Sequence, residues 1–165
     1  MRVIHSIRSF HTWRRTQDSL DGRIGFVPTM GALHAGHLSL IHRARKQCRT
    51  IVVSVYVNPL QFGPAEDLGR DPRSFSDDRR LCQQAGVDLL FVPRPEEFYS
   101  SDFQTTVRVN RLTQRWEGED RPTHYQGVTT VVTKLFCAVR PHLAYFGQKD
   151  YQQYLVVNQL IRDLN

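Results

Sequence analysis

The chain has 165 residues, and its composition of 40% hydrophobic and 23% charged residues is typical of a single folded domain and excludes a disordered chain. No apolar run approaches the length needed to cross a bilayer. The 22 lysines and arginines exceed the 16 acidic residues and leave a formal charge of +6, which favours polyanionic ligands without separating a nucleoside triphosphate from RNA.

Strands and helices are expected to alternate along the chain. Four short apolar runs bounded by turn residues predict buried strands. These runs are residues 23–28, 50–57, 87–93 and 142–147. A first helix is predicted to begin near His37, with the apolar stripe Leu38, Ile41 and Ala44. Further helices are predicted over residues 74–86, 127–139 and about 150–164.

This order predicts an α/β fold, a Rossmann-like doubly wound parallel sheet in one domain over residues 1–165. Ligands of such sheets sit beyond the carboxyl ends of the strands. Three loops follow predicted strands there: PTMGALHAGH from Pro28, NPLQFGP from Asn58 and GQKDYQQ from Gly147. We therefore expect the functional residues on these loops.

The first loop carries an H-x-G-H pattern between His34 and His37. Gly31 and Gly36 permit close approach of the backbone to a ligand, and the following helix directs its N–H groups and positive dipole end into the same space. The pattern favours a phosphate site in which both imidazoles donate hydrogen bonds. The alternatives are that His34 caps the turn while His37 is an ordinary polar residue, or that both bind a metal, for which nearby ligands are lacking.

Other loop residues suit the same kind of ligand. Lys149 can neutralise triphosphate oxygens, and Asp150 can hold a ribose hydroxyl or a magnesium-bound water, although Asp150 is also a good helix N-cap. Gln61 and Gln153 offer a donor and an acceptor each, which suits a small hydroxylated acid.

Asp77 and Asp78 stand in the first turn of the helix predicted from Ser74. They are candidate Mg²⁺ ligands, but acidic residues at this position usually complement the helix dipole, and the residues alone favour that interpretation.

Cys48, Cys82 and Cys137 are widely spaced and form no C-x-x-C pair, so neither a disulfide framework nor a zinc site is indicated. The start, MRVIHSIRSF, lacks the apolar block of a secretory signal. We therefore expect a cytoplasmic protein that does not contact a membrane.

The loops and their surroundings resemble the pantothenate synthetase (pantoate-β-alanine ligase) family. PTMGALHAGHLSL, VNPLQFGPAEDL with DPRSFSDD, RPTHYQGVTTVVTKLF and FGQKDYQQ are similar to motifs of that family and occur in its order, over roughly residues 23 to 164. The family belongs to the nucleotidyl-transferring group that shares H-x-G-H. The resemblance implies condensation of pantoate with β-alanine at the expense of ATP, through a pantoyl adenylate, with release of AMP and pyrophosphate.

The resemblance also implies roles for individual residues. His37, His34 and Lys149 would be catalytic, and Gln61 and Gln153 would bind pantoate. The ATP site would comprise Met30, Gly31, Ala32, Leu33, His34, Ala35, Gly36, His37, Gly147, Gln148, Lys149 and Asp150. Thr29 and Asn58 would join the substrate site, and Asp77 and Asp78 would hold Mg²⁺. A homodimer is implied as well.

Departures from the family pattern concern loops and length. Asp71 stands before Pro72 where tyrosine is usual, Thr123 replaces a glycine, and EEFYSS lacks the Met-Tyr-Pro ending. The family continues into a smaller C-terminal domain that closes over the ATP site, and this chain ends at Asn165. We therefore expect weak or absent turnover from these 165 residues alone.

Two other functions remain open from the residues. One is a different H-x-G-H nucleotidyltransferase that acts on another carboxylate or on a phosphate monoester. The other is an RNA-binding module that uses the basic surface, although the chain lacks an RNA motif and we expect no nucleic-acid partner.

Overall fold

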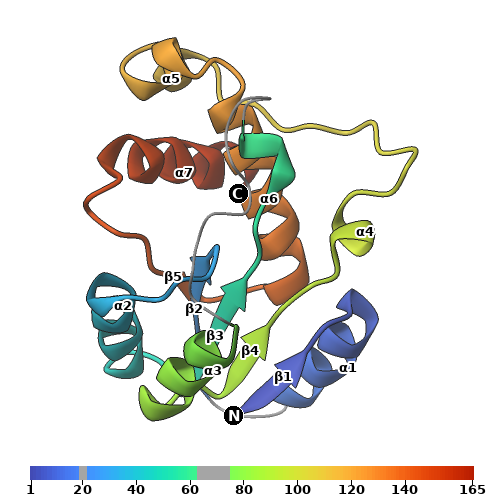
Figure 1. Cartoon of the computed structure of the whole chain (residues 1–165), viewed down its shortest axis with the longest axis vertical. Helices are drawn as coiled ribbons and strands as arrows, with labels where there is room; N and C mark the ends of the chain where they lie inside the picture. Colours follow the sequence, from blue (N-terminus) through green and yellow to red (C-terminus); the bar gives the residue numbers. More distant parts are fainter. Residues whose placement is uncertain (19–21, 63–74) are drawn as a thin grey trace.

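The computed structural model describes residues 1–18, 22–62 and 75–165. Its centre is a five-stranded parallel sheet of order β1-β4-β3-β2-β5 (Figure 1). The strands are β1 (Arg2–Ile4), β2 (Ile24–Thr29), β3 (Thr50–Val55), β4 (Leu89–Phe91) and β5 (Leu143–Ala144). The predicted α/β class and parallel sheet are confirmed.

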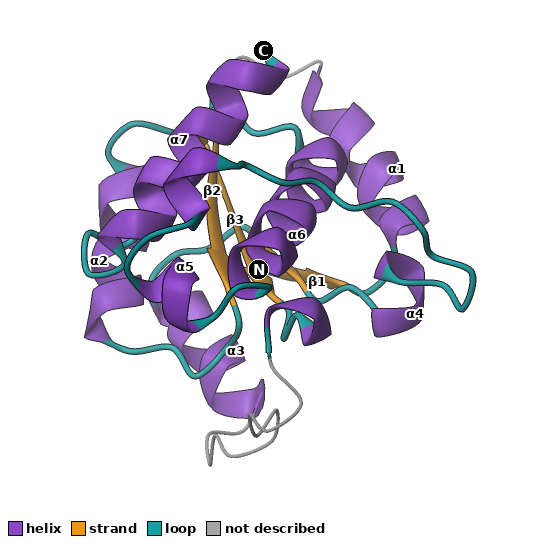
Figure 2. Cartoon of the chain, turned by 90° about the horizontal axis from the view of Figure 1, so that it is seen from above, coloured by secondary structure: helices purple, strands orange, loops and turns teal. Residues whose placement is uncertain are grey.

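Helices cover both faces of the sheet, with β2 and β3 between them (Figure 2). The long helices are α1 (Ile7–Asp18), α2 (Ala35–Arg45), α3 (Phe75–Gln84), α6 (His124–Val139) and α7 (Tyr151–Leu164). Side chains alternate along the strands, so Phe26 and Val52 join the core with α1, α6 and α7, whereas Val27 and Val53 join the core with α2 and α3. This two-sided burial explains why the strands are continuously apolar.

The strand order places a change of winding direction at β2. The chain moves from β2 to β3 and β4 on one side, and later returns to lay β5 against the opposite edge of β2. The carboxyl ends of β2, β3 and β5 are therefore neighbours, and such a crevice is the usual ligand site of doubly wound sheets. The three loops singled out in the sequence begin at these ends.

Element boundaries differ from the prediction in places. Strand β1 and helix α1 were not predicted: β1 has only three residues, of which the first two are not buried, and α1 is mostly polar, with Phe10 and Trp13 as its buried apolar side chains. Helix α2 begins at Ala35, two residues earlier than expected, because His34 caps it. Ser74 lies outside the described residues. Within the described ranges, no helix is long and apolar enough to span a membrane.

A close approach between α6 and the 3₁₀ turn η1 (Pro59–Gln61) fixes the loop after β3. An ideal Cβ at Gly127 would lie 2.4 Å from the carbonyl oxygen of Leu60 and 2.6 Å from the amide nitrogen of Gln61. Only a residue without a side chain allows the helix and the turn this close together. The remaining short helices are α4 (Pro95–Phe98), η2 (Arg111–Thr113) and α5 (Glu117–Asp120).

Gly127→Ala is expected to lower the free energy of unfolding by about 1 to 3 kcal/mol, because the added methyl group collides with the backbone of η1. The sign is opposite to the gain that alanine usually gives inside a helix. Urea unfolding followed by circular dichroism measures the change. Gly147→Ala is the matched control, since nothing described lies within 4 Å of a Cβ there. A Gly127→Ala chain as stable as the parent would contradict the close approach.

Candidate active site

The turn that follows β2 is held by hydrogen bonds of the Thr29 side chain. The Thr29 hydroxyl donates to the Ser54 carbonyl oxygen at 2.7 Å and accepts the Gly31 N–H at 3.2 Å. Gly31 and Ala32 then adopt positive φ angles of 94° and 52°. A positive φ is unfavourable for alanine, so the turn needs support from outside its own residues.

Asp78 on α3 supplies that support. Its side chain is 3% exposed, and its two carboxylate oxygens accept the backbone N–H groups of Ala32 at 2.9 Å and Leu33 at 2.7 Å. Leu33 is fully buried in the core between the sheet and α2 and α3. The carboxylate of Asp78 and the buried side chain of Leu33 therefore hold the turn in place.

The two histidines form a reciprocal cap on the start of α2. Nδ1 of His34 accepts the Gly36 N–H at 3.1 Å, and Nδ1 of His37 accepts the His34 N–H at 3.4 Å. The rings lie together with centroids 4.1 Å apart. Because Nδ1 of each ring is an acceptor, the hydrogen-bond pattern assigns the proton to Nε2, which is the atom that can donate to an anion.

Gly36 makes this arrangement possible. A Cβ at Gly36 would lie 2.8 Å from Cε1 of His34, so any side chain would displace the ring. The first turn of α2 carries no acidic residue, and its last turn carries His42, Arg43 and Arg45. The positive end of the helix dipole is thus left for a ligand. The capping interpretation of His34 is confirmed, and it is compatible with phosphate binding through Nε2.

The electrostatics of His37 favour a neutral ring. Burial, followed by the neighbouring His34, holds the pKa of His37 below its ordinary value of 6.5, while the charges of Asp78 and Asp150 act in the opposite direction. A neutral imidazole with hydrogen on Nε2 is therefore the form that meets a ligand near pH 7. An incoming phosphate would raise this pKa and favour proton donation.

The amides of Asn58 and Gln61 lie beside the histidine turn. Asn58 is 1% exposed, and its Nδ2 donates to the carbonyl oxygen of Gly127 at 3.0 Å and to Oε1 of Gln61 at 3.1 Å. Nε2 of Gln61 contacts Sδ of Met30 at 2.7 Å. A thioether is a weak acceptor, so a substrate oxygen would readily take its place.

A cavity of about 150 Å³ joins these parts. Seven residues that the sequence predicts for the site line this cavity: Thr29, Met30, His37, Asn58, Gln61, Asp150 and Gln153. Sequence reasoning missed the wall that completes it, namely Pro28, Tyr56, Val128, Val131, Val132, Leu135 and Phe146. The valines and the leucine follow the helical apolar period, a pattern that indicates a buried helix face and not a ligand site, and all four belong to the core on this face of the sheet. The result is a small pocket with one apolar side and one polar side, typical of a small-molecule site.

Some candidate residues lie around the cavity and not in its lining. Lys149 and Gln148 are exposed on the loop between β5 and α7, and His34 is exposed at the start of α2. Asp150 precedes α7 and forms no side-chain cap bond to that helix, which the structure describes in full. Asp150, which does line the cavity, thus occupies the predicted N-cap position of α7 without using its carboxylate as a cap.

The two predicted magnesium ligands differ in their surroundings. Asp78 is committed to the histidine turn, whereas the Asp77 side chain is 49% exposed and pairs with Arg80 at 3.4 Å. Among the described residues, no three His, Cys, Asp or Glu side chains gather as a metal-binding group. A Mg²⁺ ion that binds through nucleotide phosphates needs only one or two carboxylates, so magnesium ligation stays a prediction.

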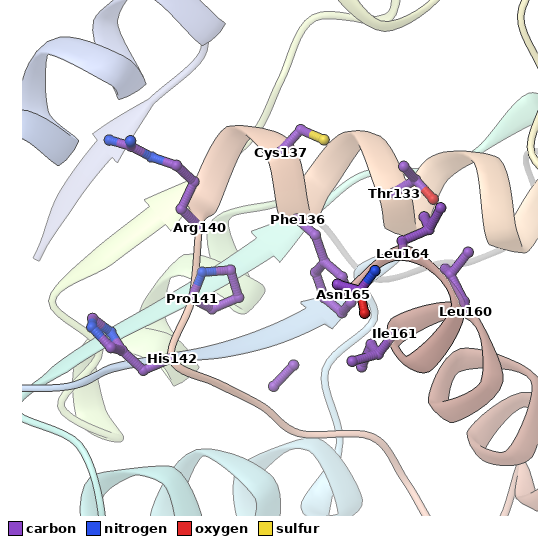
Figure 3. Close-up of a pocket in the computed structure, with 11 residues that line it drawn as sticks. Thr133, Phe136, Cys137, Arg140, Pro141, His142, Leu160, Ile161, Leu164 and Asn165 are labelled. Atoms are coloured by element: carbon purple, nitrogen blue, oxygen red, sulfur yellow. The ribbon is translucent and has the colours of Figure 1, made fainter.

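A separate cavity of about 420 Å³ lies between α6, α7 and the segment that leads into β5 (Figure 3). Leu160, Ile161 and Leu164 of α7 face Phe136 of α6 across it, and His142 lies at its rim. The cavity is mostly apolar and shares no lining residue with the histidine site. It therefore takes no part in the chemistry considered below.

The fold and the site define a doubly wound α/β domain with a histidine-capped helix start and a small pocket at the switch in strand order, the place where such domains usually bind ligands. The pantoate-beta-alanine ligase family model matches residues 2–165, so the chain belongs to that family. This agrees with the resemblance carried by the sequence motifs.

Curated relatives are similar over most or all of the chain. The pantothenate synthetase of Heliobacterium modesticaldum is 53% identical over 165 residues, and that of Thermus thermophilus is 60% identical over 142 residues, or 86% of the chain. The matched regions span only 59% and 51% of these relatives. The chain thus corresponds to little more than half of each relative's length.

Solved structures share the fold. The crystal structure of pantothenate synthetase from Thermus thermophilus matches 99% of the chain and 58% of its own, with a TM-score of 0.90 and 52% identity. The pantoate-beta-alanine ligase of Francisella tularensis, in complex with beta-gamma ATP and beta-alanine, matches 99% of the chain and 63% of its own, with a TM-score of 0.92 and 37% identity.

Asp78→Asn is expected to lower the free energy of unfolding by about 1 to 3 kcal/mol, because an amide nitrogen would face one of the two backbone N–H groups of the turn. Thermal and urea unfolding measure the loss. Asp77→Asn makes the same chemical change one residue earlier and is expected to cost less than about 1 kcal/mol, since its ion pair is exposed. Equal losses in the two variants would contradict the assigned role of Asp78.

The lowered pKa of His37 predicts a dependence of stability on pH. The unfolded chain binds the proton more tightly than the folded one, so protonation favours unfolding. The stabilisation is fully present above pH 6.5 and is lost as the pH falls through the lower pKa of the folded state. The Tm of His37→Asn should therefore fall less steeply below pH 6.5 than that of the parent. His42→Asn, at an exposed site on α2, is the control and should keep the parent slope.

Proposed function

We propose that this chain is the substrate-activating part of an enzyme that joins pantoate to β-alanine at the expense of ATP. One observation carries the proposal: the paired histidines cap α2 through Nδ1, which leaves both Nε2–H groups as donors beside a pocket lined by Asn58, Gln61 and Gln153. The ATP complex of the Francisella tularensis relative supports ATP as co-substrate.

The pocket suits pantoate. Its apolar side, formed by Val128, Val131, Val132 and Leu135, would pack against the two methyl groups of the acid. Its amide side would bind the carboxylate and hydroxyl oxygens through Gln61 and Gln153, with Thr29 and Asn58 behind them. The pantoate carboxylate is already ionised at neutral pH, so the first step needs no strong general base.

In the first step, a pantoate carboxylate oxygen attacks the α-phosphorus of ATP and forms a P–O bond. The bond between the α-phosphorus and the bridging oxygen breaks, and pyrophosphate leaves with its electron pair. His34, His37, Lys149 and the N-terminal N–H groups of α2 would stabilise the charge on the phosphates. The residues from Met30 to His37 and from Gly147 to Asp150 would form the ATP site.

In the second step, the neutral amine of β-alanine attacks the acyl carbon of the pantoyl adenylate. The C–O bond to AMP breaks, the amine loses a proton, and the products are pantothenate and AMP. Gln61, at the edge of the cavity, would also border the β-alanine site. Exclusion of water would protect the adenylate between the two steps.

We propose that Mg²⁺ binds together with ATP, and that the carboxylates of Asp77 and Asp78 would hold it. Oxygen ligands fit this ion, and each Asp78 oxygen that accepts one N–H bond retains a further lone pair. When bound, Mg²⁺ neutralises charge on the triphosphate.

We further propose a cytoplasmic homodimer that acts on small molecules and not on nucleic acid. The three free cysteines, two of them buried, agree with a reducing compartment. Residues 1–165 would form a nucleotide- and pantoate-binding domain, and the relatives' greater length leaves room for a part that closes the site.

The decisive experiment is pantoate-dependent exchange of labelled pyrophosphate into ATP, because this exchange reports the reversible first step alone. His37→Ala is expected to reduce the exchange by about 100-fold or more, through loss of one donor to the reacting phosphates. His42→Ala, on the exposed side of α2, is the matched control and should retain the parent rate.

The outcomes separate the competing functions. Exchange that requires pantoate and fails with other carboxylates supports the proposal. Exchange with a different acid would favour another H-x-G-H nucleotidyltransferase. If exchange is absent, calorimetric titration with ATP and with pantoate follows. A chain that binds neither ATP nor pantoate would refute the assignment.

A further inference from the structure

The orientation of the Gln61 amide depends on its neighbour Asn58. The carbonyl oxygen of Gly127 can only accept, so the nitrogen of the Asn58 side chain must face it, at 3.0 Å. The same nitrogen donates to Oε1 of Gln61 at 3.1 Å. Gln61 is therefore left with its Nε2 toward the cavity, where Met30 Sδ lies at 2.7 Å.

The remaining atom of the Asn58 amide is held by a residue from another part of the chain. The Tyr99 hydroxyl, just beyond α4, donates to Oδ1 of Asn58 at 2.8 Å. Tyr99 lies outside the set of described residues that line the cavity. Its effect on a ligand in the cavity is therefore indirect, through Asn58 and then Gln61.

The ring of Tyr99 is itself fixed. It packs edge-on against Phe103, with centroids 4.9 Å apart, and the Nζ of Lys134 on α6 lies 5.6 Å from its centroid. The hydroxyl consequently reaches Asn58 from a ring that is in contact with both Phe103 and Lys134. Because Asn58 is 1% exposed, loss of this donor would leave Oδ1 buried without its partner.

We propose that Tyr99 is a positioning residue for the acid substrate: through Asn58 it holds Gln61 with an N–H donor directed into the cavity. This orientation selects a ligand that presents an acceptor oxygen there, such as the carboxylate or hydroxyl oxygens of pantoate. The inference rests on the proposed function, since it concerns the same pocket. It assigns a role to a residue that never contacts the substrate.

The test is separate calorimetric titration of the 165-residue chain with pantoate and with ATP. Tyr99→Phe removes one oxygen atom and keeps the packed ring. The dissociation constant for pantoate is expected to rise about tenfold and that for ATP to stay unchanged. Tyr145→Phe is the matched control, because it also removes a hydroxyl that donates to an amide oxygen, that of Gln47 at 2.9 Å, and should retain pantoate affinity.

A double-mutant cycle tests the route of the effect. Asn58→Ala removes the partner of Tyr99, so the addition of Tyr99→Phe to Asn58→Ala should cause no further loss of pantoate affinity. In the single variant Tyr99→Phe, the side-chain amide resonances of Asn58 and Gln61 should shift even without ligand. Unchanged resonances would contradict the relay.

The remaining outcomes are distinct. If the parent chain binds pantoate and Tyr99→Phe binds it equally well, the positioning role is wrong while the proposed function stands. Equal losses for pantoate and ATP would indicate general damage and overturn the role as well. If the parent binds ATP but not pantoate, the proposed substrate itself is wrong, and this inference fails with it.

Discussion

The buried carboxylate of Asp78 accepts two consecutive backbone N–H groups, and the histidine site depends on this contact. Ala32 has a positive φ that its own side chain disfavours, and the turn places His34 at the start of α2. An ionised acceptor that receives two short hydrogen bonds can offset such strain. Asp78 therefore links α3 to the geometry of the candidate phosphate site, in addition to any contact with a metal.

The H-x-G-H motif combines a structural and a chemical requirement in four residues. Each ring uses Nδ1 to satisfy a backbone N–H near the helix start, so helix capping and orientation of Nε2 follow from the same hydrogen bonds. Gly36 permits this because a side chain there would collide with the ring of His34. Capping and anion binding are thus complementary, although they stood as alternatives at the level of sequence.

The amide side of the pocket is built on a different principle. Gly127 brings α6 against η1, and its carbonyl oxygen then sets the direction of the Asn58 amide, which in turn sets that of Gln61. Each of these two amides is oriented by a partner that can only donate or only accept, so the polarity that Gln61 presents to the cavity is decided by groups behind it. Asp78 of α3 holds the histidine side of the site. Gly127 of α6 and Tyr99, which follows α4, hold the amide side.

The sequence by itself determined the alternation of strands and helices, the loops that carry His34, Gln61 and Lys149, and the family, because apolar period, turn residues and motif order are local patterns. It missed the three-residue strand β1, which offers too few positions for a pattern. Only the tertiary structure decided that Asp78 holds a turn 46 positions away, that Tyr99 reaches Asn58 across 41 positions, and that four residues of α6 contribute to the pocket wall. Hydrogen bonds and contacts between distant residues depend on how the sheet brings its loops together, and they produce no periodic pattern in the sequence from which they could be predicted.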